Sequence, residues 1–221
     1  GRPGPVVLAI PFDIQHALIE DDLPDPRPYM RFRPPAPDPQ GVDEAIALLK
    51  KAKRPLVVCG SGVANSRGFD ALQAFAETAG VPVVCTPTGK AALPETHRLS
   101  LGCVGRAGTL HGNHAARTCD LVIAVGTHFS DIDTGGWTLF DIPNKTKLIH
   151  VDIDTSELGR AYRTEVALTS DARLALEALT VAAKAAGVAE QKTWTDELAA
   201  ERTAFNEAVK LGNGTLTIFN A

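Results

Sequence analysis

The chain has 221 residues, of which 44% are hydrophobic and 22% charged, an ordinary composition for a globular protein. A formal net charge of −4 argues against nucleic acid as a partner, and no apolar run reaches the ~18 residues that a membrane helix needs. The first residues also lack the charged and then apolar blocks of a secretory signal. We therefore expect no nucleic-acid partner, no membrane association and no secretion.

The cysteines of the chain are predicted to be reduced, structural thiols. Cys59, Cys85, Cys103 and Cys119 show no C-x-x-C pairing and no regular spacing, which fits neither a zinc site nor a disulfide framework. Two of them, Cys59 and Cys85, end apolar runs, where cysteine behaves as a small buried hydrophobic residue. Reduced thiols are typical of a cytoplasmic protein, which is the location we expect.

Proline dominates the beginning of the chain, since ten of the fifteen prolines lie within residues 1–39. Residues 5–11 are predicted to form a buried strand. Residues 20–28 contain three prolines and can form neither a helix interior nor a central strand, so they are predicted to be an extended linker. A lone strand before a linker indicates the end of a neighbouring domain. We therefore expect residues 1–40 to be the end of an N-terminal domain plus a linker.

From residue 41 the pattern changes to a regular alternation of helical and strand-like segments. Helices are predicted at residues 41–53, 69–78, 111–118 and 172–186, and strands at residues 55–59, 81–85, 121–125, 148–153 and 165–168. The strand-like segments are short runs of valine, isoleucine and leucine, which is typical of strands buried on both faces. The alternation predicts an α/β fold: a three-layer, mostly parallel Rossmann-like sheet with helices on both faces, over residues 41–186.

The last part of the chain, residues 187–221, is predicted to be a helical linker toward a further domain. Residues 191–210 have the pattern of a charged, amphipathic helix that contains Trp194. Residues 211–221 carry no pattern that predicts a structure.

A glycine-containing turn, Gly60-Ser61-Gly62, directly follows the first predicted strand of this domain and precedes a helix. Glycines at such a place allow backbone N–H groups to approach a phosphate, and a helix N-terminus favours an anion. Asn65 stands where the dinucleotide-binding motif has its third glycine, and Thr86-Pro87-Thr88 replaces the acidic residue expected after the second strand. These departures disfavour a standard NAD-binding domain. Glycines that simply form a tight turn are the alternative.

Polar residues and glycines also follow the other predicted strands, at residues 86–90, 126–131 and 152–155. The carboxyl ends of parallel strands form the ligand crevice of an open α/β sheet, so this pattern favours a nucleotide-like ligand over an empty scaffold. Asp152 is placed to accept hydrogen bonds from ribose hydroxyls. Asp154 has two possible roles, a contact to the ligand or a helix N-cap in a capping box with Glu157, and the N-cap is favoured. Asp171, at the start of a predicted helix, has the same two possible roles.

The histidines do not predict a metal site. His111 and His114 are three residues apart near a helix start, but no third ligand lies at the spacing of a metalloenzyme. His128 is close in sequence to Asp131 and Asp133, with which it could form an acid–base pair if the fold brings them together. We predict no metal ligand and no catalytic residue within this chain.

Four segments, taken as an ordered set, resemble the central domain of thiamine-diphosphate enzymes of the acetohydroxyacid (acetolactate) synthase type. They are residues 53–62, 86–90, 119–127 and 150–154, and the resemblance extends over residues 42–183. Residues 4–15 resemble the last strand of the N-terminal domain of that family. The resemblance implies that the parent protein is an enzyme, a transferase or lyase that acts on 2-keto acids.

The resemblance also implies partners and cofactors that lie outside this chain. In the family, an N-terminal domain carries the glutamate that activates thiamine diphosphate, and a C-terminal domain binds the diphosphate through Mg²⁺ with a Gly-Asp-Gly motif. No Gly-Asp-Gly occurs in these residues. We therefore expect thiamine diphosphate and Mg²⁺ to be bound by missing N- and C-terminal domains of the same protein, a homo-oligomeric full-length enzyme, and no catalysis by this chain alone.

The central domain of acetohydroxyacid synthases holds an FAD, so the resemblance implies cofactor contacts at positions matching the family's motifs. They are Gly60, Ser61, Gly62, Gly105, Arg106, Gly108, Thr109, Gly126, Thr127, His128, Asp152 and Ile153. Two arginines of the family pattern are replaced here by His128 and Ile132. Loss of these guanidinium groups weakens the expected hold on a pyrophosphate, for which Arg106 could compensate in part.

Three alternatives to an FAD-bearing central domain stay open. Residues 134–140 look more like the trihydroxycyclohexanedione hydrolases, which share the fold and represent a flavin-free relative. A stand-alone nucleotide-binding module, sirtuin-like or flavin-carrying, is the second alternative. A structural interaction domain with an empty crevice is the third.

Overall fold

The computed structural model describes residues 2, 4–20, 22–29 and 33–211, and the chain divides into two units, residues 1–34 and 35–221. In the first unit, the described residues form one short helix, α1 (Phe12–Gln15), and one 3-10 turn, η1 (Arg27–Tyr29). The described residues of the predicted linker before η1 form neither a helix nor a strand, and Arg27 and Pro28 of that linker lie within η1.

The prediction of a buried strand at residues 5–11 is wrong. The described residues there form no strand, and Val6 and Val7 are 91% and 92% exposed. A strand needs a neighbour for its backbone hydrogen bonds, and the described part of the chain supplies none for this segment. The apolar pattern of the segment was therefore misleading about its structure in this chain.

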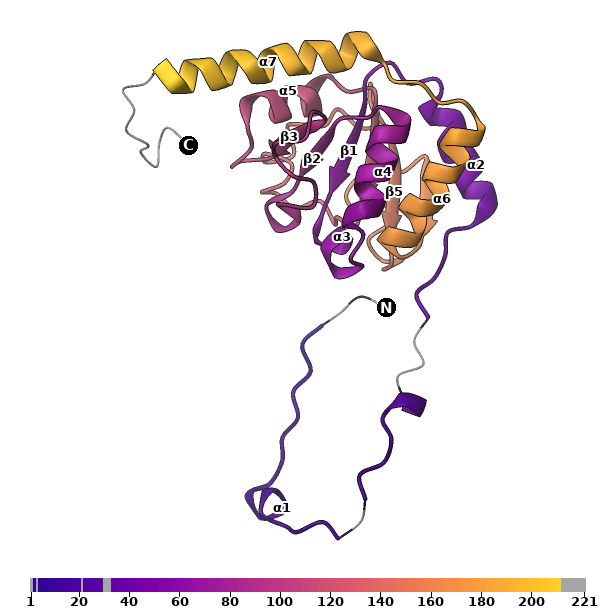
Figure 1. Cartoon of the computed structure of the whole chain (residues 1–221), viewed down its shortest axis with the longest axis vertical. Helices are drawn as coiled ribbons and strands as arrows, with labels where there is room; N and C mark the ends of the chain where they lie inside the picture. The colour runs from indigo at the N-terminus through magenta and orange to yellow at the C-terminus, as the bar shows by residue number, and fades with distance from the viewer. Residues whose placement is uncertain (1, 3, 21, 30–32, 212–221) are drawn as a thin grey trace. The chain divides into compact units, whose positions relative to one another are not determined.

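Six parallel strands form one sheet in the described part of the second unit, in the order β3-β2-β1-β4-β5-β6 (Figure 1). The strands are β1 (Pro55–Cys59), β2 (Val83–Cys85), β3 (Ser100–Cys103), β4 (Leu121–Val125), β5 (Lys147–Asp152) and β6 (Val166–Thr169). The predicted α/β, Rossmann-like sheet is confirmed. The strand order reverses between β1 and β4, and such a reversal places a crevice at the carboxyl ends of the strands.

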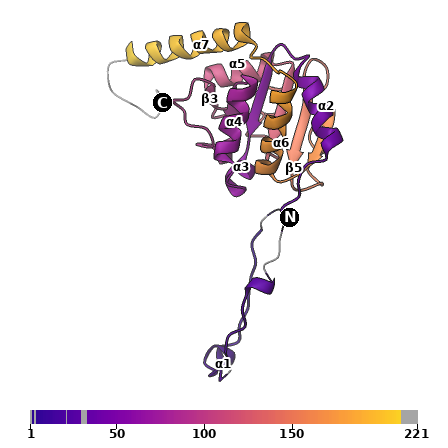
Figure 2. The same ribbon diagram turned by 45° about the vertical axis from the view of Figure 1, so that its right-hand side comes forward.

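Helices cover both faces of the sheet, so the domain has three layers (Figures 1 and 2). One face packs against α2 (Pro39–Leu49), α4 (Phe69–Ala79) and α6 (Ala172–Ala185). The other face packs against α5 (Leu110–Thr118), residues 129–140 and α7 (Lys192–Leu211). Successive residues of β1 alternate between the two apolar clusters, with Val57 in the first and Leu56 in the second.

Local hydrogen bonds explain where the predicted helices begin and end. Helix α2 begins at Pro39, because the Asp38 carboxylate accepts from the backbone N–H of Gly41 and proline suits the first helical position. The sequence left the role of Asp171 open, and the structure shows an N-cap: its carboxylate accepts from Leu174 N at the start of α6. The strands predicted at residues 55–59 and 121–125 match β1 and β4, and the bounds of the other predicted elements agree or differ by one to four residues, as is usual at helix and strand ends.

The prediction that Asp154 caps a helix is wrong. Its carboxylate accepts from the backbone N–H and the hydroxyl of Ser156 at 3.0 and 2.7 Å, and residues 155–160 form turns rather than a helix. Glu157 instead pairs with Arg160, at 2.6 Å. A short polar side chain that bonds two residues ahead favours a turn over a helix.

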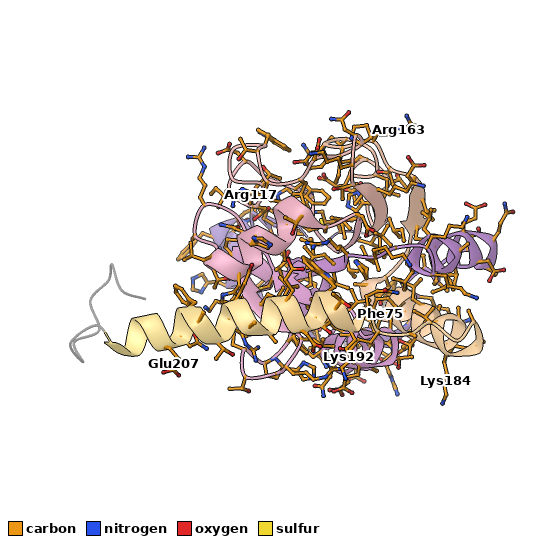
Figure 3. The ribbon with its side chains drawn as sticks, turned by 90° about the horizontal axis from the view of Figure 1, so that it is seen from above. Phe75, Arg117, Arg163, Lys184, Lys192 and Glu207 are labelled. Carbon is orange, nitrogen blue, oxygen red and sulfur yellow. The ribbon has the colours of Figure 1, made fainter. Side chains whose placement is uncertain are left out.

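Helix α7 confirms the predicted amphipathic helix and lies at the end of the sheet opposite α3 (Ser61–Asn65) (Figure 1). Figure 3 shows it from above, with Lys192 near its start and Glu207 toward its other end. The buried Trp194 donates its indole N–H to the carbonyl of Pro55, and Leu198 is 1% exposed. These contacts fix the first half of α7 on the domain. Residues 212–221 of the predicted linker lie outside the described residues.

All four cysteines are free thiols. Among the described residues, no helix combines the length and the apolar character that crossing a bilayer requires.

Candidate functional site

The carboxyl ends of the parallel strands meet at one edge of the sheet, which we name the carboxyl edge. Strands β1 and β4 pair in register from Pro55↔Leu121 to Cys59↔Val125, so they end at the same level. The turns that follow them therefore lie side by side. The 3-10 turn η2 (Pro87–Gly89), which follows β2, lies against the first of these turns: Gly89 packs on the Cys59 carbonyl.

Three predicted site glycines make the contact between the turns after β1 and β4. A Cβ atom on Gly62 would lie 2.5 Å from the Cα of Gly126, and one on Gly60 would overlap the Gly126 carbonyl oxygen. Gly126 itself has φ +60, a left-handed conformation that disfavours other residues. Glycine is therefore required at these positions by the close approach of two backbones.

Backbone N–H groups of the turn after β1 are bonded within the protein. Gly60 N donates to Val125 O, Gly62 N donates to Gly126 O, each at 3.0 Å, and Val63 N donates to Gly60 O at 3.2 Å. Ser61, between the glycines, is half-buried. Donors that already bond a carbonyl are not available to a phosphate in this conformation.

The loop after β3 is likewise held by internal hydrogen bonds. Gly105 N donates to the Asn113 side chain at 2.9 Å, and that side chain donates back to Gly105 O at 3.0 Å. Gly108 N donates to Gly105 O. Thr109 caps α5, because its hydroxyl accepts from Gly112 N at 3.0 Å. The predicted site residues Gly105, Gly108 and Thr109 therefore all have structural roles in shaping this loop.

Arg106 is the exposed cation of this loop. Its backbone N–H donates to Ile132 O, and its guanidinium pairs with the Asp131 carboxylate at 2.8 Å. Both side chains are more than half exposed, so the pair contributes little to stability, about 0–1 kcal/mol. The pair joins the loop after β3 to the loop after β4.

The acid–base pair that the sequence left open for His128 and a neighbouring aspartate is not formed. Asp131 pairs with Arg106, and the buried Asp133 accepts from the backbone N–H and the hydroxyl of Ser130 at 3.0 and 2.8 Å. The half-buried His128 is held through its carbonyl, which accepts from the Arg160 guanidinium at 2.7 Å. The aspartates stabilise the loop and do not activate the histidine.

Thr127 is positioned by a histidine that the sequence analysis did not single out. His150, 2% exposed within β5, bonds the Thr127 carbonyl through Nε2 at 2.8 Å. A carbonyl only accepts, so Nε2 carries the proton and donates. Burial lowers the pKa of His150, which keeps the imidazole neutral. A polar residue inside an otherwise apolar strand is the sequence signal that could have identified it.

This buried imidazole makes the stability of the domain depend on pH. The native pKa of His150 lies below the ordinary value of 6.5, so the unfolded state binds the proton first and stability falls as the pH drops below about 6.5. In His150→Gln the amide keeps a donor for Thr127 but does not titrate. We expect thermal unfolding between pH 7.5 and 5 to show a shallower loss of stability in this variant. An equal loss of stability with falling pH in the two proteins would contradict the assignment of this pH dependence to His150. The pKa of His111 is also lowered, but it contributes equally to both proteins.

The carboxylate predicted to accept hydrogen bonds from ribose hydroxyls lies at the end of β5. Asp152 is 9% exposed and accepts from the backbone N–H of Asp154 at 2.9 Å. Burial raises the pKa of this carboxyl above its ordinary value. Ile153, which follows it, is half-buried. A buried carboxylate at this edge can accept hydrogen bonds from a sugar.

An aromatic cluster supports the loop after β4. Phe129 is 1% exposed and makes edge-to-face contacts with Phe140, His150 and Tyr162 at ring-centroid distances of 5.1 to 5.8 Å. Trp137, 48% exposed, contacts Tyr162 at 5.9 Å. The loop between β4 and β5 supplies Phe129, Trp137 and Phe140. Strand β5 supplies His150 and the following loop supplies Tyr162, so the assembly of the cluster depends on the tertiary fold.

A parallel sheet of this strand order, with glycine turns in contact where the order reverses, defines the class of Rossmann-like α/β domains. Within that class, the family described as "Thiamine pyrophosphate enzyme, central domain" matches residues 42–179. The chain belongs to this family.

Curated relatives agree with the family assignment. The chain is 37% identical to the acetolactate synthase large subunit of Corynebacterium glutamicum, over 90% of this chain and 32% of that protein. It is 35% identical to acetolactate synthase 2, chloroplastic, of Nicotiana tabacum, over 81% of this chain and 27% of the relative. It is 36% identical to the glyoxylate carboligase of Escherichia coli O157:H7, over 81% of this chain and 30% of that protein. The chain thus spans about a third of the length of these relatives.

Proposed function

We propose that this chain is the central domain of a thiamine-diphosphate-dependent carboligase that acts on 2-keto acids, as a transferase or lyase resembling acetolactate synthase. The match of residues 42–179 to the family's central domain carries the proposal, together with relatives that share about 35% identity over most of the chain. In the proposed division, residues 1–40 end an N-terminal domain and form a linker, residues 41–186 are the central domain, and residues 187–221 lead toward a C-terminal domain.

The proposal assigns the reaction to other parts of the full protein. The relatives are about three times as long as this chain, which supports further domains that hold thiamine diphosphate and Mg²⁺. Thiamine diphosphate would supply the carbanion chemistry when bound there. The full protein is proposed to be homo-oligomeric, and this chain alone inactive. Four free thiols support a cytoplasmic location.

For this domain we propose FAD binding at the carboxyl edge. Two residues support it: Arg106 presents an exposed guanidinium that suits a phosphate, and Asp152 presents a buried carboxylate that suits a ribose. Ser61, Thr127, His128 and Ile153 are the other half-buried or buried positions proposed to line the site. The glycines have no Cβ atom, and they are proposed to allow a ligand to approach the backbone closely.

A specific observation favours a second candidate, a flavin-free relative of the trihydroxycyclohexanedione hydrolase type. The N–H groups of Gly60, Gly62, Gly105 and Gly108 donate within the chain, so they do not form a cradle for a pyrophosphate. Asp131 neutralises Arg106, and His128 and Ile132 replace the arginines of the flavin-bearing family pattern. In this candidate the carboxyl edge has a structural role only.

A binding titration of the purified chain distinguishes the two candidates. We expect FAD to bind with competition by ADP and with little response to NAD. Arg106→Ala should weaken FAD binding about tenfold or more, because a charge-assisted bond to phosphate is lost, while Arg117→Ala, at an exposed position of α5, should leave it unchanged. If a folded sample binds none of the three nucleotides, the flavin-free candidate is favoured. A strong preference for NAD would contradict both.

A further inference from the structure

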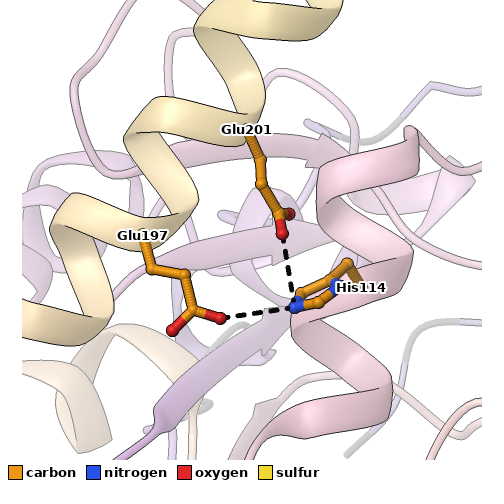
Figure 4. A group of neighbouring side chains, drawn as sticks. All are labelled: His114, Glu197 and Glu201. Atoms are coloured by element: carbon orange, nitrogen blue, oxygen red, sulfur yellow. Dashed lines mark ion pairs between the residues drawn. The ribbon is translucent and has the colours of Figure 1, made fainter.

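A second cluster of chemically active side chains lies away from the carboxyl edge, where α5 and α7 pack together. His114 projects from α5, and Glu197 and Glu201 project from successive turns of α7 toward it (Figure 4). The two glutamates are four residues apart, which places them on one face of the helix. Nothing in the proposed function uses these three residues.

The distances within the cluster suit a metal ion better than hydrogen bonds. His114 Nε2 lies 3.5 Å from Glu197 Oε1 and 3.4 Å from Glu201 Oε1, and the ligand atoms all lie within 4.8 Å of one another. Zinc bonds of about 2.0–2.1 Å in a tetrahedral site separate neighbouring ligand atoms by roughly 3.3–3.4 Å. Two edges of this cluster thus already have nearly that length.

The His114 Nε2 atom supplies an independent observation. It is buried from solvent and makes no hydrogen bond among the described residues, although the two carboxylates face it. Its neighbours are the two carboxylate oxygens at ion-pair distances of 3.5 and 3.4 Å, which are longer than a good N–H···O hydrogen bond. A metal ion between the imidazole and the carboxylates would satisfy this nitrogen and both oxygens.

Glu197 is held in position by a neighbouring arginine. Arg54 donates to both oxygens of Glu197, at 3.2 and 2.9 Å, and its guanidinium also lies 4.7 Å over the ring of Trp194. A carboxylate oxygen has two lone pairs, so Oε1 can accept from Arg54 and still bind a metal. Partners of this kind orient metal ligands and are common around metal sites.

We propose that His114, Glu197 and Glu201 bind one divalent transition-metal ion, with Zn²⁺ as the best match, and that the ion fixes α7 to α5. One imidazole and two carboxylates are ligands that zinc accepts, and a water would complete the fourth position. Mg²⁺ and Ca²⁺ prefer all-oxygen sites and fit this set less well. The two carboxylates balance the charge of the ion.

The test is a calorimetric titration of the metal-free 221-residue chain with Zn²⁺. We expect one ion per chain and a higher thermal unfolding temperature with zinc. His114→Ala and Glu201→Gln should each weaken binding at least tenfold, and Glu201→Gln keeps the side-chain shape should the alanine variant fail to fold. His97→Ala is the matched control, since His97 pairs with a single carboxylate, Glu77, at 3.0 Å and should bind no ion.

Cobalt substitution identifies which residues hold the ion. With Co²⁺ we expect a spectrum without thiolate-to-metal charge transfer, because nitrogen and oxygen ligate the ion. A charge-transfer band would place the metal at the cysteines, of which Cys85 and Cys103 have sulfur atoms 3.5 Å apart, and would overturn the proposal. Zinc binding that is unchanged in both His114→Ala and Glu201→Gln, or no binding by the folded chain, would also overturn it.

Discussion

Replacing Gly126 by alanine is expected to destabilise the domain by about 2–5 kcal/mol. A left-handed backbone at a non-glycine residue costs roughly 1–2 kcal/mol, and Gly126 has φ +60. Overpacking costs about 1–3 kcal/mol more, because the new Cβ would lie 2.6 Å from the Cα of Gly62. Urea denaturation of the two proteins measures the difference.

Gly187→Ala is the matched control for this prediction. Gly187 has φ +63, nearly the conformation of Gly126, but a Cβ there would meet nothing within 4 Å. We expect this variant to lose only the conformational part, about 1–2 kcal/mol. Equal losses in the two variants would mean that the turns after β1 and β4 separate easily. In that case a ligand could reach the backbone of these turns, which contact each other in the present structure.

Phe129→Ala should cost about 3–5 kcal/mol, the usual range for removing a fully buried aromatic ring. Phe129 is 1% exposed and lies between Phe140, Tyr162 and His150, so its removal leaves a cavity under the loop after β4. The loss should appear in urea denaturation of the whole domain, because these rings belong to the apolar cluster on one face of the sheet.

Phe69→Ala provides the control with the same change of side chain. Phe69 is 43% exposed at the start of α4, so its truncation should cost about 1 kcal/mol or less. A loss at Phe129 no larger than that at Phe69 would show that the aromatic cluster does not hold the loop in place.

The sequence predicted most of the fold because the strands are buried on both faces. Continuous apolar runs such as residues 55–59 and 121–125 are typical of strands that helices cover on both sides, and their alternation with helical segments indicates parallel strands. β3 was missed, because four residues that include a glycine and a serine carry little strand signal. The strand predicted at residues 5–11 failed because apolar character alone supplies no pairing partner.

The sequence predicted that several candidate residues lie at one edge of the sheet, but it did not predict their hydrogen bonding. Parallel topology alone brings Gly60 and Gly126 to the same edge. Whether their N–H groups face a ligand or a carbonyl depends on a backbone contact that no local pattern encodes. The cluster of His114 with Glu197 and Glu201 could not be predicted either, because α5 and α7 are far apart in sequence and meet only through packing.

The most direct test of the proposed function uses the complete protein that contains this sequence, purified from its native host. Bound cofactor is measured by mass spectrometry, and carboligation is assayed with 2-keto acids, glyoxylate among them. We expect a polypeptide about three times as long as this chain, about one thiamine diphosphate per polypeptide, and a carboligated product. A protein that carries NAD, holds no thiamine diphosphate and forms no product would contradict the assignment.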